Sequence, residues 1–392
     1  MDRKNNQDKS FSKELLKLFV YLLFVFLIFI ICAEAGARFF INSLIPLDPY
    51  LEVDPKLEWK FKPDQSFVLT SPDNKKITNT INSKGLKGEE FGEKQTNTTR
   101  ILVPGGSFTA AVHVNAQDCY TNILELKLNE ANNKNYEVIN AGVYGYDLAQ
   151  ENTFLKEDGF SYNPDLVILS FYTKTHIKNY GKPQKGLFGS LLSSLSKNSY
   201  LFYYIRKIGE KEDPDLSTEN AIKASLDSYK SILKSYHSKL PDDDVLARYI
   251  TQYINEVDFF TTLDNAKLSM LSESEQMIEL IYEECNKRNL KTLFVVIPSK
   301  RQVIPSEKEK TQLLYNQYYD NREIINLDKV HNKFIEDLKE NNIPILDLLP
   351  ELRKEENPEE LYFEFDGHWN KNGHSAVAGI IYNYLVENNL IE

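Results

Sequence analysis

The sequence predicts an α/β fold built on a parallel sheet, and three observations support that prediction. Apolar runs recur from residue 100 to residue 349, in the order RILVPG, YEVINAG, PDLVILSF, KTLFVVIP and IPILDLL. Continuous runs of this length are typical of strands buried on both faces of a parallel sheet. Helical patterns separate them, at residues 118–132, 149–157, 267–288 and 329–340. The alternation indicates parallel strands joined by right-handed crossovers.

The composition narrows the class of protein. The 392 residues are 42% hydrophobic and 12% aromatic, which is enough to fill a core. The 57 acidic residues outnumber 46 Lys and Arg, for a net charge of -11, which argues against a nucleic-acid partner. The three cysteines form no CxxC or CxxH pair, so neither a zinc site nor a disulfide framework is predicted: Cys32, Cys119 and Cys285.

The N-terminal segment predicts a membrane anchor. Residues 18–31 form an apolar run that carries no charge. Together with its flanks, this run approaches the roughly 20 residues that span a bilayer. Five basic residues precede this run, whereas Arg38 is the only basic residue among the twenty residues that follow it. Because basic residues favour the cytoplasmic side, we expect a cytoplasmic tail at 1–17 and a transmembrane signal anchor at 18–40. A cleaved signal peptide is the alternative, because the AEA at residues 33–35 fits a cleavage site. The long run and its charged cap favour the anchor, which would place the rest of the chain outside the cytoplasm.

After the anchor we expect a membrane-proximal segment at 41–99, with exposed strands in KLEWKFKP and QSFVLTS, and one domain at 100–392. The connection between the third and fourth apolar runs is far longer than a crossover needs, which predicts a helical insertion at about 180–265. Residues 186–207 are unusually apolar and aromatic. A lid or a membrane-surface patch is possible there, and packing on the core is favoured.

Ser107 is the first candidate functional residue. It follows the first predicted strand, and catalytic groups gather at the carboxyl ends of parallel strands. Gly105 and Gly106 allow a sharp turn that points the serine into the crevice, with its N–H facing an oxyanion. The motif is not the G-x-S-x-G elbow, because residue 109 is Thr. A tight turn or an anion-binding loop is the alternative.

A serine nucleophile needs a base that a third group orients. Among six histidines only His368 has suitable neighbours, because Asp366 precedes it by two residues in a glycine-containing turn. The carboxylate can take the Nδ1 proton and leave Nε2 free to accept the serine proton. The alternative makes Asp366 a helix N-cap and His368 a surface residue.

From about residue 100 to 390, apart from the insertion, the chain resembles the GDSL/SGNH hydrolases. These are serine esterases, lipases and carbohydrate O-acetyl esterases, with a few O-acyltransferases, on a three-layer α/β/α fold of the flavodoxin-like type. PGGSFT matches the first block, with Gly106 in place of the usual aspartate and Ser107 as the implied nucleophile. NAGVYGYD matches the second, so the N–H of Gly145 would join that of Ser107 in the oxyanion hole. DGHWNKNGH matches the last and implies Asp366 and His368, although its spacing is Asp-x-His, so that Glu364 is the fallback acid.

The third block departs from the family. Relatives carry Gly-x-Asn-Asp there, whereas this chain has SFYTKTHIKN, with Thr175 aligned to the Asn and His176 to the Asp. The Thr175 hydroxyl could be the third oxyanion donor, or Asn179 could reach in. Loss of such a donor typically lowers the rate by about 10²- to 10³-fold.

The resemblance implies a serine esterase that hydrolyses or transfers an acyl ester, with no metal or cofactor, and the predicted anchor would place it on the membrane outside the cytoplasm. The expected partners are an acyl ester of a cell-envelope glycan or lipid, and the membrane itself. The alternative is a catalytically inactive envelope protein that keeps the fold to bind a glycan or a protein. The altered third block and the aromatic stretch at 199–204 favour that alternative.

Overall fold

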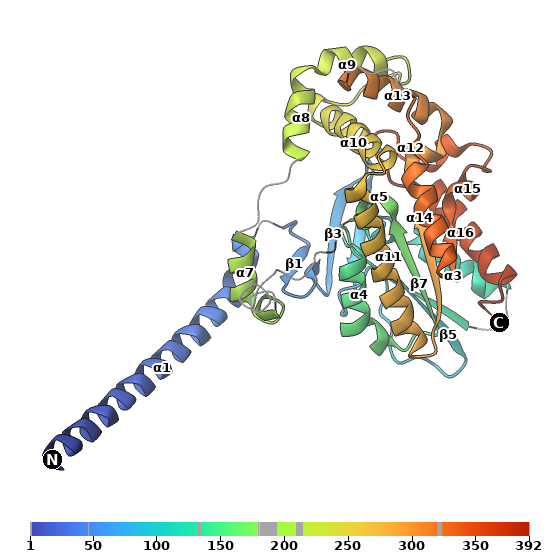
Figure 1. The fold of residues 1–392 in the computed structure, drawn as a ribbon. Coiled ribbons are helices and arrows are strands. Elements are labelled where there is room, and N and C mark those ends of the chain that lie inside the picture. Colours follow the sequence, from blue (N-terminus) through green and yellow to red (C-terminus); the bar gives the residue numbers. More distant parts are fainter. Residues whose placement is uncertain are drawn as a thin grey trace. The chain divides into compact units, whose positions relative to one another are not determined.

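A computed structural model describes residues 2–45, 47–131, 135–178, 180, 194–208, 215–319 and 324–391 (Figure 1). The chain divides into two compact units. The first, here called the anchor unit, comprises residues 1–60 and 182–211, and the second, the α/β unit, comprises residues 61–181 and 212–392.

The anchor unit contains one long helix, α1 (Asp2–Leu44), a two-stranded sheet of β1 (Leu51–Asp54) and β2 (Glu58–Phe61), and α7 (Tyr200–Ile208); the last residue of β2 belongs to the α/β unit. Residues 13–44 of α1 are apolar enough to cross a membrane, with a mean hydropathy of 3.0 over their most apolar window. Ile41, Val53 and Tyr203 form a small buried cluster.

The structure corrects the favoured prediction for residues 186–207. Their described part, 194–207, belongs to the anchor unit, where α7 packs on α1. Residues 186–193 lie outside the described residues. Apolar composition predicted burial for this stretch but could not identify the partner.

The α/β unit is built on five parallel strands in the order β6-β5-β7-β8-β9. They are β5 (Thr98–Gly105), β6 (Asn135–Gly142), β7 (Leu166–Tyr172), β8 (Lys291–Ile297) and β9 (Ile345–Asp347). Numbered within the sheet, this order is 2-1-3-4-5, the flavodoxin-like arrangement. The predicted fold class is therefore confirmed. The last strand is shorter than predicted, because the Asp347 side chain accepts from Leu349 N and begins α15 (Leu348–Leu352).

Helices cover both faces of the sheet (Figure 1). On one face lie α3 (Tyr120–Ala131), α15 and α16 (Lys371–Glu387), which share a core with Ile101, Val103, Ile168 and Val295. On the other lie α4 (Leu148–Glu157), α11 (Asn265–Asn286) and α14 (Lys329–Glu340). These helices begin and end within two residues of the predicted bounds. The result is a three-layer α/β/α sandwich.

A hairpin and a helical group complete the α/β unit. The hairpin joins β3 (Gln65–Thr70) to β4 (Lys76–Ile81), and the Asn79 amide donates to the Val112 carbonyl at 3.1 Å. The helical group contains α8 (Asp215–Ala224), α9 (Leu226–Leu233) and α10 (Asp243–Thr261), which form an apolar cluster with α13 (Pro305–Tyr319). Short helices follow three strands: α2 (Ser107–Ala110), α5 (Thr173–His176) and α12 (Lys300–Val303).

Candidate active site

Ser107 is the first residue of α2 and follows β5 after a single residue. Two glycines allow α2 to approach the sheet closely. A Cβ on Gly105 would overlap the Thr109 side chain and lie 2.9 Å from the Ser170 carbonyl oxygen, and one on Gly142 would overlap the backbone of α2. The turn that presents the serine thus requires glycine at these positions.

The structure brings Ser107, His368 and Asp366 together. His368 Nε2 lies 2.8 Å from Ser107 Oγ, and His368 Nδ1 lies 2.6 Å from Asp366 Oδ1. The backbone N–H of His368 also donates to Asp366 Oδ1 at 2.7 Å, which fixes the turn. Asp366 does not cap the following helix, since the side chain of Asn370 accepts from the first N–H groups of α16. The helix-cap interpretation of Asp366 is therefore wrong.

The charges in this chain of hydrogen bonds suit proton transfer. Burial alone would lower the pKa of His368, but the adjacent Asp366 carboxylate outweighs burial and raises it above its ordinary value. Burial would raise the pKa of Asp366, but His368 outweighs burial and lowers it well below the usual range. Asp366 is thus a carboxylate that holds the Nδ1 proton, and Nε2 is free to accept from the serine.

Aromatic side chains hold the His368 ring in place. The Phe108 ring centroid lies 4.8 Å from that of His368 and 4.6 Å from that of Trp369. Both Phe108 and Trp369 are buried. A second histidine, His113, lies 5.8 Å from His368, ring centroid to centroid.

The segment that carries Asp366 is held from two sides. Lys300 Nζ donates to the carbonyl oxygens of Phe363 and Glu364, both at 2.8 Å. His237 Nδ1 lies 2.8 Å from Glu364 Oε1, and the His237 ring lies 4.6 Å from that of Phe365. Glu364, the fallback acid, is therefore paired with His237 while Asp366 is paired with His368.

Lys300 and His237 were not found by sequence reasoning. Burial, helped by the nearby cations Lys310 and Arg301, lowers the pKa of Lys300 to about 7. The sequence does contain an indication of Lys300, because this residue follows the end of β8 just as Ser107 follows the end of β5, at the same edge of the sheet. His237 had none, since its contact with Glu364 spans 127 residues.

The second block lies against the nucleophile turn. Gly145 has a φ of +81°, which favours glycine, and Val143 N donates to the Gly105 carbonyl oxygen at 3.0 Å. The Tyr146 carbonyl oxygen would lie 3.0 Å from a Cβ on Gly106. The loop that carries Gly145 is thus attached directly beside Ser107.

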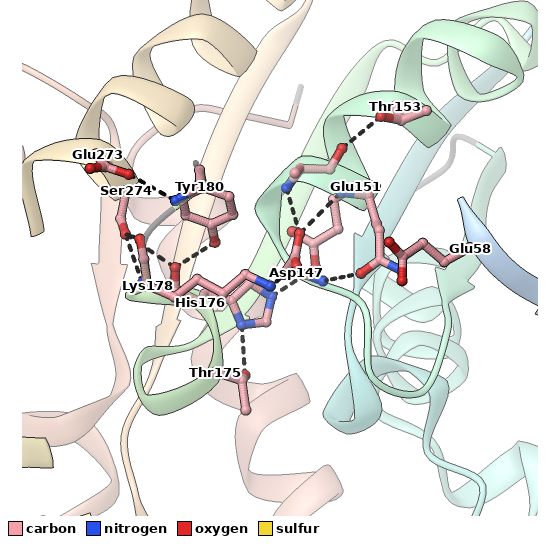
Figure 2. Close-up of polar contacts among 12 residues, drawn as sticks. Glu58, Asp147, Glu151, Thr153, Thr175, His176, Lys178, Tyr180, Glu273 and Ser274 are labelled. Carbon is pink, nitrogen blue, oxygen red and sulfur yellow. Dashed lines mark hydrogen bonds and ion pairs between the residues drawn. The ribbon is translucent and has the colours of Figure 1, made fainter. Parts of the chain in front are cut away.

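The third block forms a separate buried pair, which Figure 2 shows. His176 Nε2 lies 3.0 Å from Glu151 Oε1, and both side chains are buried. Thr175 is exposed, and its hydroxyl lies 2.9 Å from His176 Nδ1 and 3.3 Å from the Tyr172 carbonyl oxygen. The Thr175 hydroxyl thus already has two partners in this structure. Asn179, the alternative donor, lies outside the described residues.

A cavity of about 370 Å³ is lined in part by His113. Its lining combines carboxylates, amides and ammonium groups with two aromatic rings: Asp73, Lys75, Ile77, His113, Val114, Asn115, Asp118, Tyr362, Phe363, Glu364, Asn370, Lys371 and Asn372. Within the described residues, no three His, Cys, Asp or Glu side chains form a metal-binding group.

Comparison with known proteins adds a family match. Residues 259–390, about a third of the chain, match the model of the "SGNH hydrolase-like domain, acetyltransferase AlgX". The matched segment contains Lys300, Asp366 and His368 but not Ser107. A search of curated proteins found no match.

Several solved structures are similar at low identity. A lipase/acylhydrolase from Enterococcus faecalis is 12% identical, with 74% of this chain and 96% of that chain covered and a TM-score of 0.37. A GDSL-like lipase from Bacteroides thetaiotaomicron is 12% identical, with 76% and 93% covered and a TM-score of 0.36. The acetyl xylan esterase AlAXEase is 16% identical, with 73% and 99% covered and a TM-score of 0.37.

The family model and the strand order of the sheet, with its strand-end motifs, are the features that bear on the family of this chain. Residues 259–390 of the α/β unit are accordingly similar to an SGNH hydrolase-like domain, and the strand order and strand-end motifs of the unit agree with a fold of the GDSL/SGNH type.

Proposed function

We propose that this chain is a membrane-anchored serine enzyme that cleaves an acyl ester outside the cytoplasm, with Ser107 as nucleophile. The observation that carries the proposal is the pair of hydrogen bonds from Ser107 Oγ to His368 and from His368 to Asp366. The long apolar helix α1 supports the anchor, and the basic residues before it support a cytoplasmic N-terminus.

In the first half-reaction Ser107 Oγ attacks the ester carbonyl carbon while His368 Nε2 takes the serine proton. The negative charge that develops on the carbonyl oxygen is held by the N–H groups of Ser107 and Gly145. The tetrahedral intermediate then expels the alcohol, which receives the proton from His368, and the acyl group stays on Ser107. Asp366 keeps the imidazole in the required tautomer throughout.

In the second half-reaction a hydroxyl group attacks the acyl enzyme, with His368 again the base. Water gives hydrolysis and a sugar or lipid hydroxyl gives transfer. The family description names an acetyltransferase, which supports keeping transfer beside hydrolysis. The mixed polar lining of the cavity beside His113 supports a hydroxyl-rich alcohol, as in a cell-envelope glycan, over a lipid chain.

Hydrolysis of 4-nitrophenyl acetate by the full chain in detergent tests the proposal, with Ser107→Ala and His368→Ala beside it. We expect both variants to lose nearly all turnover. Ser161→Ala, which changes an exposed serine in the same unit, is the matched control and should keep full activity. A fluorophosphonate should label the wild type and Ser161→Ala but not Ser107→Ala.

A second candidate function is an inactive SGNH-like envelope protein that binds a glycan or a protein. The altered third block favours it, because Thr175 and His176 stand where the family carries Asn and Asp. A folded wild type that neither turns over ester nor reacts with the fluorophosphonate would overturn the enzyme proposal and leave this one.

A further inference from the structure

A carboxylate from α1 holds the start of α7. Glu34 accepts hydrogen bonds from Ser199 Oγ at 2.6 Å, from Leu201 N at 3.1 Å and from Tyr200 N at 3.2 Å. The two backbone N–H groups belong to the first turn of α7, where such donors have no partner within the helix and where a negative charge is also favoured by the helix dipole. The first turn of α7 is therefore fixed at the level of Glu34 along α1.

That level can be placed in a membrane. Residues 15–33 precede Glu34, and at 1.5 Å per residue they span about 28 Å, close to the roughly 30 Å of a hydrocarbon core. Lys17 is the one charged residue in this run and lies near its N-terminal end, where a lysine can reach the headgroups. If α1 crosses the bilayer, Glu34 lies at the outer edge of the hydrocarbon, and the start of α7 lies there with it.

The two faces of α7 differ. Tyr203 is 1% exposed, and Tyr200 and Tyr204 pack beside it against Ile41 and Val53. The opposite face carries Ile205, which is 47% exposed, with Leu201 and Phe202 half-buried beside it. The last turn carries Arg206 and Lys207, which pair with Glu58.

The neighbouring surface of α1 is apolar as well. Beyond Glu34, the side chains of Phe39, Phe40 and Leu44 are 80%, 56% and 48% exposed. Exposed aromatic and aliphatic side chains with basic residues at one end are typical of helices that lie in the membrane interface.

From the Glu34 cap and these exposed faces we infer that α7 is a second membrane-contacting element, an interfacial helix whose Leu201, Phe202 and Ile205 contact lipid. The occupant of this surface is the bilayer itself, at the boundary between headgroups and acyl chains. The inference depends on the proposed membrane anchor. If α7 contacts lipid, a segment inserted between β7 and β8 returns to the membrane. The chain then passes between the anchor unit and the α/β unit three times, at residues 60–61, 181–182 and 211–212.

Tryptophan quenching in lipid vesicles tests this inference. The full chain is reconstituted in phosphatidylcholine vesicles that carry bromine at acyl positions 6,7 or 11,12, and fluorescence is compared with that of the unsubstituted chain, which already contains Trp59 and Trp369. Ile205→Trp should add emission that the shallow 6,7 bromines quench at least twofold more than the deep ones. Glu34→Ala, which removes the cap, should reduce that quenching when combined with Ile205→Trp.

Two further tryptophan substitutions serve as controls. Phe24→Trp, within the apolar run, should be quenched more by the deep bromines, and Leu280→Trp, 48% exposed on α11, should not be quenched. If the Ile205→Trp emission is as insensitive to bromine as that of Leu280→Trp while Phe24→Trp is quenched, the inference about α7 is overturned and the anchor stands. Absence of quenching in Phe24→Trp would overturn the anchor itself.

Discussion

The imidazole of His176 occupies the space beside Gly106 into which a side chain at residue 106 would point. A Cβ there would lie 3.4 Å from His176 Cε1 and 3.0 Å from the Tyr146 carbonyl oxygen. These two residues are two of the places where the chain departs from the GDSL/SGNH pattern, and the pattern has aspartate at both. The departures are linked in space, because a Cβ at residue 106 would already contact the His176 ring, so a longer side chain there would compete with the ring for space.

This link predicts non-additive substitutions. Gly106→Asp should lower the melting temperature and the rate of fluorophosphonate labelling, since its carboxylate would meet the His176 ring. His176→Ala should relieve part of that loss, with a coupling energy of about 1 kcal/mol or more in a double-mutant cycle. Gly92→Asp, at an exposed glycine with no atom near its Cβ position, is the control. Strictly additive effects would contradict the link.

The identity of the carboxylate that orients His368 can be tested through the pH dependence of kcat. We expect the acidic limb of kcat to follow the pKa of His368, which Asp366 raises, so activity falls as the pH drops and the imidazole takes a proton. Asp366→Asn should lower that pKa, move the limb to lower pH and reduce kcat by about 10⁴-fold. Glu364→Gln changes the neighbouring carboxylate that pairs with His237, and its pH profile should match that of the wild type. The reverse result would assign the role to Glu364.

Lys300 should matter through the segment that it holds. Lys300→Met leaves the buried carbonyl of Phe363 without its donor, which should lower the free energy of unfolding by about 1–3 kcal/mol. Because the segment carries Asp366, kcat should fall while KM stays unchanged. Lys267→Met removes another buried ammonium group, on α11 over the Phe259 ring, without contact to those carbonyls or to His237. We expect this control to lower the free energy of unfolding without lowering kcat. If kcat is the same in both variants, Lys300 does not position the segment that carries Asp366.

Stability should fall in acid because of His374. Burial, together with the nearby Lys87 and His368, lowers its pKa to about 3, against an ordinary value of 6.5. The neutral ring is therefore favoured by folding, and the stabilisation is complete above about pH 6.5 and is lost as the pH falls toward 3. Within this range His374 contributes about 1.4 kcal/mol per pH unit to the slope of the unfolding free energy against pH. Urea unfolding between about pH 6.5 and 4.5, within that window, should show a shallower dependence of the unfolding free energy on pH for His374→Leu than for the wild type, and identical slopes would contradict the assignment.

Close packing at α2 predicts the effect of a single methyl group. Gly142→Ala should displace α2 and so remove Ser107 from His368, with loss of labelling and of several kcal/mol of stability, because the new Cβ would overlap the α2 backbone. Gly379→Ala, in the middle of α16 with open space at its Cβ position, should instead stabilise by about 0.5–1 kcal/mol. Thermal unfolding and labelling of the two variants distinguish these outcomes.

The sequence was most informative where one segment decides the outcome. The runs that form β5, β7 and β8 are apolar throughout because both faces of each strand are covered, and Ser107 and His368 each stand in a motif that can be recognised locally. The contacts that sequence reasoning missed join distant segments. Lys300 meets Phe363 across 63 residues, and Glu34 meets Ser199 across 165, so no local pattern indicates either pair.

The order of the active-site residues along the chain has a consequence for biosynthesis. Ser107 and its base are 261 residues apart, and the base comes second. During translation the serine therefore emerges long before the histidine and the aspartate that would activate it. A chain that is stalled or cut before residue 366 carries an unactivated serine, so the proposed acyl chemistry would begin only after the segment containing Asp366 and His368 has folded against α2.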